Sequence, residues 1–390
     1  GFEGRPVLNG TAIGEAVGRL RGWTISQALP LWSSAGVDPL RGTFVERLST
    51  AGEPLFDVPR RTMVQARQIY VFAHAHLLGV SPAGRDLALG AAERLVADRH
   101  AVDGRPGWVF SADRDGRVVD PRRDLYTHAF VLYGLAWAHR LSPSPRFVDA
   151  ALTTIDFLDR AFAAPRGGYV SGLPAAAERL EQNPHMHLFE AMLAWWEATG
   201  EARFLARAGE LHALMAARFF QPTTGILPEY FDATWNPCTG VTGRICEPGH
   251  HYEWSWLLRT YGRLIGRPDA PIATTLKAFA DAHGHDRDGL VVDQMLDDGS
   301  VHRASRRTWP HTEAIKAEAA AHEAGDATAS ERAARIIGRL LDVFLGRPVA
   351  GGWIDQIDAE GRALVDFMPA STLYHVFLAM AEAHRVWDGA

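Results

Sequence analysis

Cysteine and lysine are both scarce in this chain. Its 390 residues include two cysteines, Cys238 and Cys246. That is too few for a disulfide-stapled scaffold, and free thiols in a reducing cytoplasm are the expected state. The only lysines are Lys277 and Lys316, while all other basic residues are arginines. Schiff-base or pyridoxal chemistry would therefore have only two candidate nucleophiles, and no cofactor is expected.

Long apolar runs and basic blocks are absent too. No apolar run reaches the ~18 residues that suggest a membrane-spanning helix. The net charge is −6, with no cluster of basic residues. These absences argue against nucleic acid and membrane surfaces as partners. No signal-peptide pattern is visible, so we expect a cytoplasmic protein that is a monomer or a homodimer.

The remaining composition is that of a globular protein. Hydrophobic residues make up 47% and charged residues 22% of the chain, which allows a sizeable core. Since no shift in composition marks a linker, we expect a single domain over residues 1–390.

Apolar residues recur with helical spacing along most of the chain. The pattern predicts helices over 10–26, 61–78, 86–98, 124–140, 145–163, 183–199, 201–219, 248–261, 274–283, 310–324, 327–345 and 371–384. About twelve helices without a strict repeat favour an all-α fold, the (α/α)6 barrel, in which six parallel inner helices surround one funnel. Short β-like pieces that contain tryptophan are expected in the loops.

Several of the seventeen histidines lie about one helical turn after a capping residue. Asp124 precedes His128, Asn183 precedes His187, Pro248 and Gly249 precede His250, and Ser371 precedes His375. In a ring of parallel helices such histidines can converge at one end. A helix N-terminus also disfavours imidazolium, so we expect these side chains to be neutral and able to accept a proton.

Seven short motifs resemble those of the N-acylglucosamine 2-epimerase superfamily, and they follow the same order. They are Arg67-Gln-Ile-Tyr-Val-Phe72, Asp124-Leu-Tyr-Thr-His-Ala-Phe130, Gln182-Asn-Pro-His-Met-His187 with Glu190-Ala191, Gly249-His-His-Tyr-Glu-Trp254, Trp309-Pro-His-Thr-Glu313, Gly351-Gly-Trp-Ile-Asp355 and Tyr374-His375. The resemblance covers nearly the whole chain. It implies an (α/α)6 barrel and metal-free proton transfer at C2 of a sugar.

The resemblance also implies roles for individual residues. His250 and His375 match the two acid/base histidines, and Glu253 matches the carboxylate that orients His250. Arg67, Asn183 and His187 match residues that hold sugar hydroxyls and the enediolate, and Trp309 matches an aromatic wall. Tyr126, His311, Glu313 and Trp353 also lie in the shared motifs and are expected to contact substrate.

Helical geometry supports part of this assignment. His250 and Glu253 are spaced i, i+3 and share a face, whereas His251 points about 100° away. By the same geometry His185 and His187 point apart, which argues against a metal chelate. A fixed guanidinium such as Arg67 would stabilise an enediolate without titrating.

Four functions remain to be compared. The mannose isomerase branch looks most similar, which predicts interconversion of D-mannose and D-fructose. A 2-epimerase of N-acylglucosamine or cellobiose type, or a sulfoquinovose isomerase, would use the same histidines. A glycoside hydrolase needs two carboxylates, and the motifs show no evident carboxylate pair. A sugar-binding protein with a degenerate site is disfavoured because His250 and His375 are both present. Since many relatives have Gln at the position of His311, the substrate remains open.

Overall fold

Proline and glycine set several of the helix ends. The helices α6 (Pro145–Ala161), α9 (Pro248–Leu264) and α10 (Pro271–His283) all start with proline, whose missing N–H has no helical partner at that position anyway. Helix α7 (Gln182–Thr199) ends at Gly200, whose φ of 70° is left-handed, a conformation that glycine adopts without strain.

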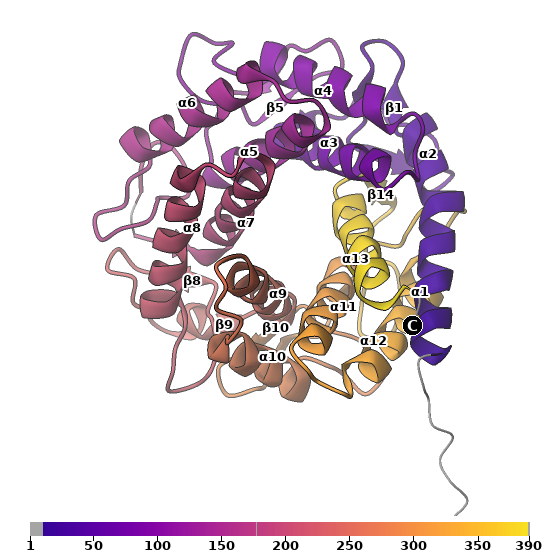
Figure 1. Cartoon of the computed structure of the whole chain (residues 1–390), viewed down its shortest axis with the longest axis vertical. Coiled ribbons are helices and arrows are strands. Elements are labelled where there is room, and N and C mark those ends of the chain that lie inside the picture. Colours follow the sequence, from indigo (N-terminus) through magenta and orange to yellow (C-terminus); the bar gives the residue numbers. More distant parts are fainter. Residues whose placement is uncertain (1–10, 177, 389–390) are drawn as a thin grey trace, which may run out of the picture.

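The computed structural model describes residues 11–176 and 178–388, and its helices form two concentric rings (Figure 1). Each inner helix packs against the next one along the chain, and the last packs against the first. The inner ring consists of α3 (Thr62–Leu77), α5 (Leu125–Leu141), α7, α9, α11 (Thr308–Glu323) and α13 (Thr372–Trp387). The outer ring consists of α1 (Thr11–Trp23), α4 (Gly84–Arg99), α6, α8 (Ala202–Leu214), α10 and α12 (Ala329–Arg339).

This architecture confirms the predicted (α/α)6 barrel. Three outer helices continue as π-helical turns, at Thr24–Ala28 after α1, Met215–Phe219 after α8 and Leu340–Phe344 after α12. The turn after α1 leads into the short helix α2 (Leu29–Ser34). The predictions for 201–219 and 327–345 therefore each span an α-helix and its π-helical turn. Gly10, the predicted start of the first helix, lies outside the described residues.

Short antiparallel strands tie the ring together at one end. Five inner helices start within three residues of the end of a strand. Each of these strands pairs with another short strand that lies in a different loop. Before α5, Asp124 forms a single bridge with Gly172 instead. The pairs are β4 (Arg60–Arg61) with β5 (Ser111–Ala112), β7 (Leu180–Glu181) with β8 (Tyr230–Phe231), β9 (Ile245–Cys246) with β10 (Gln294–Leu296), β12 (Arg306–Arg307) with β13 (Gln356–Ile357), and β14 (Phe367–Pro369) with β3 (Arg47–Ser49).

The last of these pairs closes the ring, because β3 precedes the first inner helix and β14 precedes the last. Met368 of β14 lies opposite Leu48 of β3. Four further strands extend the loops, and they are β1 (Val37–Asp38) with β2 (Thr43–Phe44), β6 (Val118–Asp120) beside β5, and β11 (Val301–Arg303) beside β10. The strands are too short to form a layer of their own. Their effect is to hold the N-terminal ends of the inner helices at one end of the barrel.

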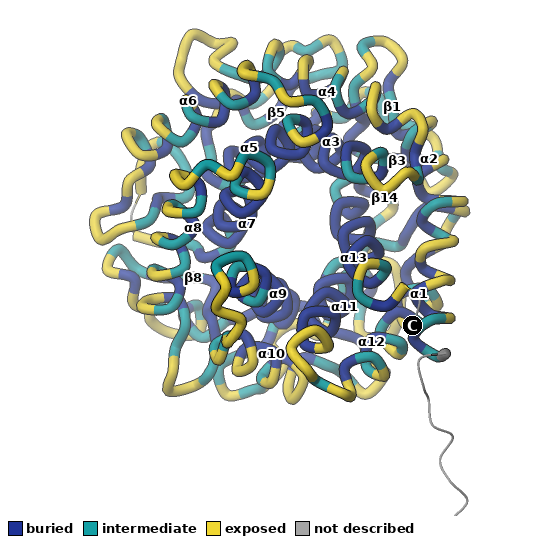
Figure 2. Tube along the Cα trace, viewed as in Figure 1, coloured by how far each residue is buried: buried dark blue, intermediate teal, exposed yellow. Residues whose placement is uncertain are grey.

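The core lies between the two rings and inside the inner one. Inner helices are buried along almost their whole length, whereas the outer helices and loops carry the exposed residues (Figure 2). On α5, for example, both Phe130 and Trp137 are buried although they lie two turns apart. Among residues 11–176 and 178–388, no helix is long and apolar enough to cross a membrane.

Four buried histidines fasten inner helices to loops. In His128, Nε2 accepts the N–H of Trp108 and Nδ1 donates to the carbonyl of Asp124. His185 and His311 repeat this pattern with their own loops, and His251 differs only in donating to a carbonyl of α10. Both ring nitrogens of each histidine are thus used by the backbone. These side chains are neutral structural links.

The four links predict sensitivity to acid. Burial lowers the pKa of His128, His185, His251 and His311 to about 4, whereas an unfolded chain binds the proton near pH 6.5. The contribution of these four histidines to the free energy of unfolding is therefore fully present above pH 6.5. It is lost as the pH falls towards 4, by up to about 1.4 kcal/mol per pH unit for each histidine.

Thermal unfolding followed by circular dichroism should show a midpoint that drops between pH 7 and pH 5. Substituting His311→Asn should lower the midpoint at pH 7 and reduce its dependence on pH. His302→Asn, on an exposed strand, should alter neither. A midpoint that stays constant down to pH 5 would show that these histidines are not neutral links.

Candidate active site

A cavity of about 310 Å³ opens where the N-terminal ends of the inner helices meet, a size at the lower end for small-molecule sites. All six inner helices contribute side chains from their first two turns, so these helices run parallel. The lining consists of Arg61, Met63, Arg67, Tyr126, Glu181, Asn183, His187, Glu229, Tyr230, Glu247, His250, Glu253, Arg307, Trp309, Asp355, Ser371, Thr372 and His375.

Eight of the eleven residues predicted for the site line this cavity. They are Arg67, Tyr126, Asn183, His187, His250, Glu253, Trp309 and His375. Asn183 is not an N-cap, because α7 begins one residue earlier, at Gln182. Its Oδ1 is buried without a hydrogen-bond partner among the described residues. A buried amide oxygen of this kind is available to a ligand.

Three predicted contact residues lie outside the lining. His311 is one of the structural links, with both nitrogens bound to backbone. Trp353 is fully buried and stacks on Trp32 with ring centroids 4.7 Å apart. Glu313 is fully buried beneath the cavity. Each of the three belongs to a motif that also contains a cavity residue, Trp309 or Asp355. The motif match alone therefore does not distinguish the side chains that reach the cavity from those that point elsewhere.

Each candidate acid/base histidine is held by a carboxylate through Nδ1. His375 Nδ1 lies 3.0 Å from Oε2 of Glu313, and His250 Nδ1 lies 2.7 Å from Oε1 of Glu229. The prediction that Glu253 orients His250 is therefore wrong. Both side chains leave α9 on the same face, as their spacing requires, but they enter the cavity side by side.

Trp309 brings the two histidines together. Its ring centroid lies 5.0 Å from that of His250 and 5.3 Å from that of His375. Because both imidazoles lie beside the same indole, their ring centroids are at most about 10 Å apart. One sugar can thus reach both rings.

The two histidines differ in their charge. Burial lowers the pKa of His375 to about 3, despite the hydrogen bond to Glu313. Burial would also lower the pKa of His250, but the charges of Glu229 and Glu247 outweigh it and raise this pKa above its ordinary value. The expectation of two neutral histidines is therefore wrong for His250. The cavity combines a neutral imidazole, suited to accept a proton, with an imidazole that holds one.

Arg67 supplies a fixed positive charge at the cavity wall. Its guanidinium donates to the hydroxyl of Tyr126 at 2.6 Å and to the carbonyl of Ser371 at 3.0 Å. The guanidinium carbon also lies 4.3 Å from the ring centroid of Phe130. These contacts fix the orientation of a charge that can face a developing enediolate.

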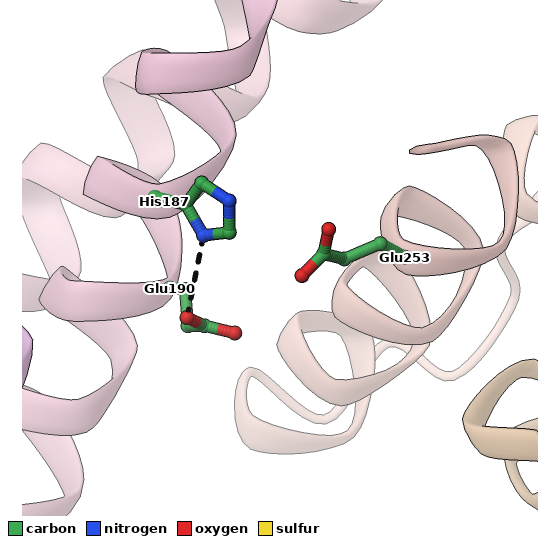
Figure 3. Close-up of side chains that lie close together, drawn as sticks. All are labelled: His187, Glu190 and Glu253. Atoms are coloured by element: carbon green, nitrogen blue, oxygen red, sulfur yellow. Dashed lines mark ion pairs between the residues drawn. The ribbon is translucent and has the colours of Figure 1, made fainter. Parts of the chain in front are cut away.

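Glu253 on α9 faces His187 and Glu190 on the neighbouring inner helix α7 (Figure 3). One ligand atom of each residue lies within 4.8 Å of the others. Burial, together with the charges of Glu313 and Glu190, raises the pKa of Glu253 well above its ordinary value. Neither of its oxygens has a hydrogen-bond partner among the described residues. Glu253 is thus a neutral carboxylic acid that can donate to a sugar hydroxyl.

Sequence comparison places the chain among known proteins. Residues 42–379 match the N-acylglucosamine 2-epimerase (GlcNAc 2-epimerase) family. A protein of Rhizobium meliloti (strain 1021) named mannose-6-phosphate isomerase is 38% identical over 94% of this chain and 96% of its own length. The chain belongs to the N-acylglucosamine 2-epimerase family.

One further relative and one solved structure are also similar to this chain. A D-mannose isomerase of Thermobifida fusca is 30% identical over 80% of this chain and 80% of its own length. The solved structure of cellobiose 2-epimerase from Spirochaeta thermophila DSM 6192 matches the fold with a TM-score of 0.85 at 24% identity, and covers 99% of both chains.

The carboxylates around the cavity are the main feature that the motifs missed. Glu181, Glu229, Glu247 and Asp355 all line it, so the expectation that the site lacks a carboxylate pair is wrong. Glu229 lies in the apolar stretch Ile226–Phe231, and a lone carboxylate in such a stretch is the one local signal for it. In this family member, the two carboxylates near His250 hold its imidazole.

Gly249 makes room for the aromatic wall. A methyl group on Gly249 would lie 2.6 Å from the Trp309 ring, so Gly249→Ala should displace the indole from between the histidines. We expect kcat/KM to fall about 100-fold, the typical cost of a 1 Å misplacement. Gly18→Ala, with nothing within 4 Å of the added methyl, is the matched control. Equal activities of the two variants would show that the position of Trp309 is unimportant.

Proposed function

We propose that this chain is an aldose–ketose isomerase that interconverts D-mannose and D-fructose through an enediol(ate). The observation that carries the proposal is a pair of cavity histidines that flank one tryptophan. Burial lowers the pKa of His375 to about 3, whereas the charges of Glu229 and Glu247 raise the pKa of His250. Isomerisation needs one base at carbon and one acid at oxygen. The named activities of the mannose isomerase relatives are consistent with this chemistry.

The proton steps follow from the two imidazoles. His375, through the nitrogen that Glu313 leaves free, takes the proton from C2 of the open-chain aldose. The C2–H bond electrons form the C1=C2 double bond, the C1=O1 π electrons move to O1, and His250 gives a proton to O1. His375 then returns its proton to C1, and the O2 proton passes to His250, which leaves a carbonyl at C2. Arg67 stabilises the negative charge that develops on the sugar oxygens during the proton transfers.

The charges around the cavity favour a free sugar over a sugar phosphate. Its three arginines already have partners: Arg61 contacts Glu46, Arg307 contacts Asp293 and Glu247, and Arg67 holds Tyr126. Four carboxylates line the same space, and these are Glu181, Glu229, Glu247 and Asp355. A phosphate dianion would have to compete with these carboxylates and with the present partners for the arginines, and the same holds for the sulfonate of sulfoquinovose.

The remaining parts of the proposal concern the setting of the reaction. We propose that the reaction requires neither a metal nor a cofactor, that the substrate is a monosaccharide, and that residues 1–390 act as one catalytic domain, as a monomer or homodimer. Cys238 and Cys246 are free, which supports a cytoplasmic location.

Substitution of the acid/base groups tests the mechanism. His250→Asn and His375→Asn should keep the helical circular dichroism spectrum and lower kcat by roughly 10²–10⁴. Arg67→Gln should cost a similar amount, because the enediolate loses its charge partner. Proton NMR in D2O with a chelator present should show fructose formed from mannose, with deuterium at C1 wherever the base exchanges with solvent.

Parallel reactions with N-acetylmannosamine, cellobiose, sulfoquinovose and mannose 6-phosphate provide the comparison. If mannose and fructose stay inert while one of the other sugars epimerises at C2, the isomerase assignment is wrong and the chain is a 2-epimerase. Faster turnover of the 6-phosphate than of free mannose would overturn the preference for a neutral substrate.

The dependence on pH tests the role of His250. The charges of Glu229 and Glu247 raise its pKa above the ordinary value despite burial, so kcat/KM should fall as the pH rises through that raised pKa. Glu229→Gln removes the charge 2.7 Å from Nδ1 and should shift this fall to lower pH. Glu181→Gln changes a cavity carboxylate and should leave the position of the fall unchanged. A Glu229→Gln profile identical to that of the parent would refute the role.

A further inference from the structure

Lys316 is a buried charge that the proposed reaction does not use directly. It lies one turn after Glu313 on α11 and is fully buried. Its Nζ lies 2.6 Å from Oε1 of Glu313 and 4.0 Å from the ring centroid of Trp256, and it is not among the residues that line the cavity. Burying an ammonium is costly unless it is paired, so its position needs an explanation beyond packing.

The groups that face Lys316 come from every inner helix around it. Glu313 lies on the same helix, Glu253 on α9, Glu190 on α7 and His375 on α13, and the charge of Arg67 on α3 also acts on His375. Ligand atoms of Glu253, Glu313 and His375 lie within 4.8 Å of one another, as do those of His187, Glu190 and Glu253. Three buried glutamates therefore crowd round one lysine, and they cannot all be ionised.

We propose that Lys316 is a positioning residue, whose ammonium keeps Glu313 ionised so that Glu313 fixes His375 as the Nδ1–H tautomer with Nε2 free at the cavity. This inference rests on the proposed isomerase function for its activity tests. It adds a link behind the histidine, in which Lys316 acts on Glu313 and Glu313 acts on His375. Lys316 itself does not touch the sugar.

The charges around Lys316 follow the same pattern. Burial would raise the pKa of Glu313, but the charge of Lys316 and the hydrogen bond from His375 lower it to about 2. Burial would lower the pKa of Lys316, and the three glutamates raise it instead. Burial raises the pKa of Glu253, which has no salt bridge with the ammonium, well above its ordinary value. Burial would also raise the pKa of Glu190, but the hydrogen bond and charge of His187 lower it. Among the three glutamates, Glu313 is the one that Lys316 pairs with directly.

Lys316→Met tests the link. Without the ammonium Glu313 should bind a proton at neutral pH and cease to accept Nδ1–H of His375. We expect kcat to fall about 100-fold at pH 7 with little change in KM, and to recover as rising pH ionises Glu313. The recovery of kcat at high pH distinguishes a positioning role from a structural one, because a merely structural ion pair would not give the variant a new dependence on pH.

The second lysine provides a matched control. Lys277 is also buried and paired, with Nζ 2.8 Å from Asp281 and 2.5 Å from Glu318, but it lies on outer helix α10. Lys277→Met removes the same group and should lower stability while leaving kcat and its pH dependence unchanged. If Lys277→Met reproduces the altered pH profile, the effect of Lys316→Met is general destabilisation and the proposal is wrong.

A double-mutant cycle isolates the path through Glu313. Glu313→Gln should also lower kcat, without recovery at high pH, because an amide does not titrate. In that background Lys316→Met should cost less than about twofold further, since no carboxylate remains for it to act on. If the two losses multiply, Lys316 acts by another route and the proposal is overturned. The neutral Gln–Met pair also avoids an unpaired buried charge, so this variant is expected to fold.

A readout without turnover separates this inference from the proposed function. Histidine-selective 15N NMR, with His375 assigned through His375→Asn, should show the neutral Nδ1–H tautomer in the parent protein. Lys316→Met should lose that tautomer preference at neutral pH, and Lys277→Met should keep it. If the parent turns over no sugar but these spectra hold, the isomerase function fails and the positioning role stands. An unchanged His375 signal in Lys316→Met would refute the role.

Discussion

Pairing between short strands fixes the ends of the inner helices, and the site depends on it. Each inner helix starts beside a strand or a bridge that is bonded to a neighbouring loop, and β14 with β3 closes the circle. Six helix N-termini therefore meet at one cavity. Glu181, Glu229, Glu247 and Asp355 line the same opening, and burial raises the pKa of Glu181, Glu229 and Asp355 there.

The same residue type serves two purposes near this end of the barrel. His128, His185, His251 and His311 give both ring nitrogens to the backbone and link helices to loops. His250 and His375 instead bind a carboxylate through Nδ1 and line the cavity. A histidine with both nitrogens used by the backbone cannot transfer protons to a ligand. Chemistry is left to those whose second nitrogen remains free.

Local patterns predicted what depends on near neighbours in the chain. Helical periodicity gave the helices, and the motifs gave Arg67, His187 and most other cavity residues, because each occupies the first two turns of its helix. The partners of the histidines depend on distant contacts. Glu229 precedes His250 by 21 residues, and Glu313 precedes His375 by 62. No periodicity encodes such pairs, and both the family motif and the i, i+3 spacing predict Glu253 as the partner of His250 instead.

The inequality of the two histidines bears on the choice between isomerisation and epimerisation. A two-base epimerase runs in both directions only if each histidine acts in turn as base and as acid, so both must lose and gain a proton readily. Here Glu313 holds a neutral imidazole, while two carboxylates keep a proton on the other. An isomerase that uses His375 at carbon and His250 at oxygen needs this difference. An epimerase would be slowed by it in one direction, which is why the pair supports proton return to C1.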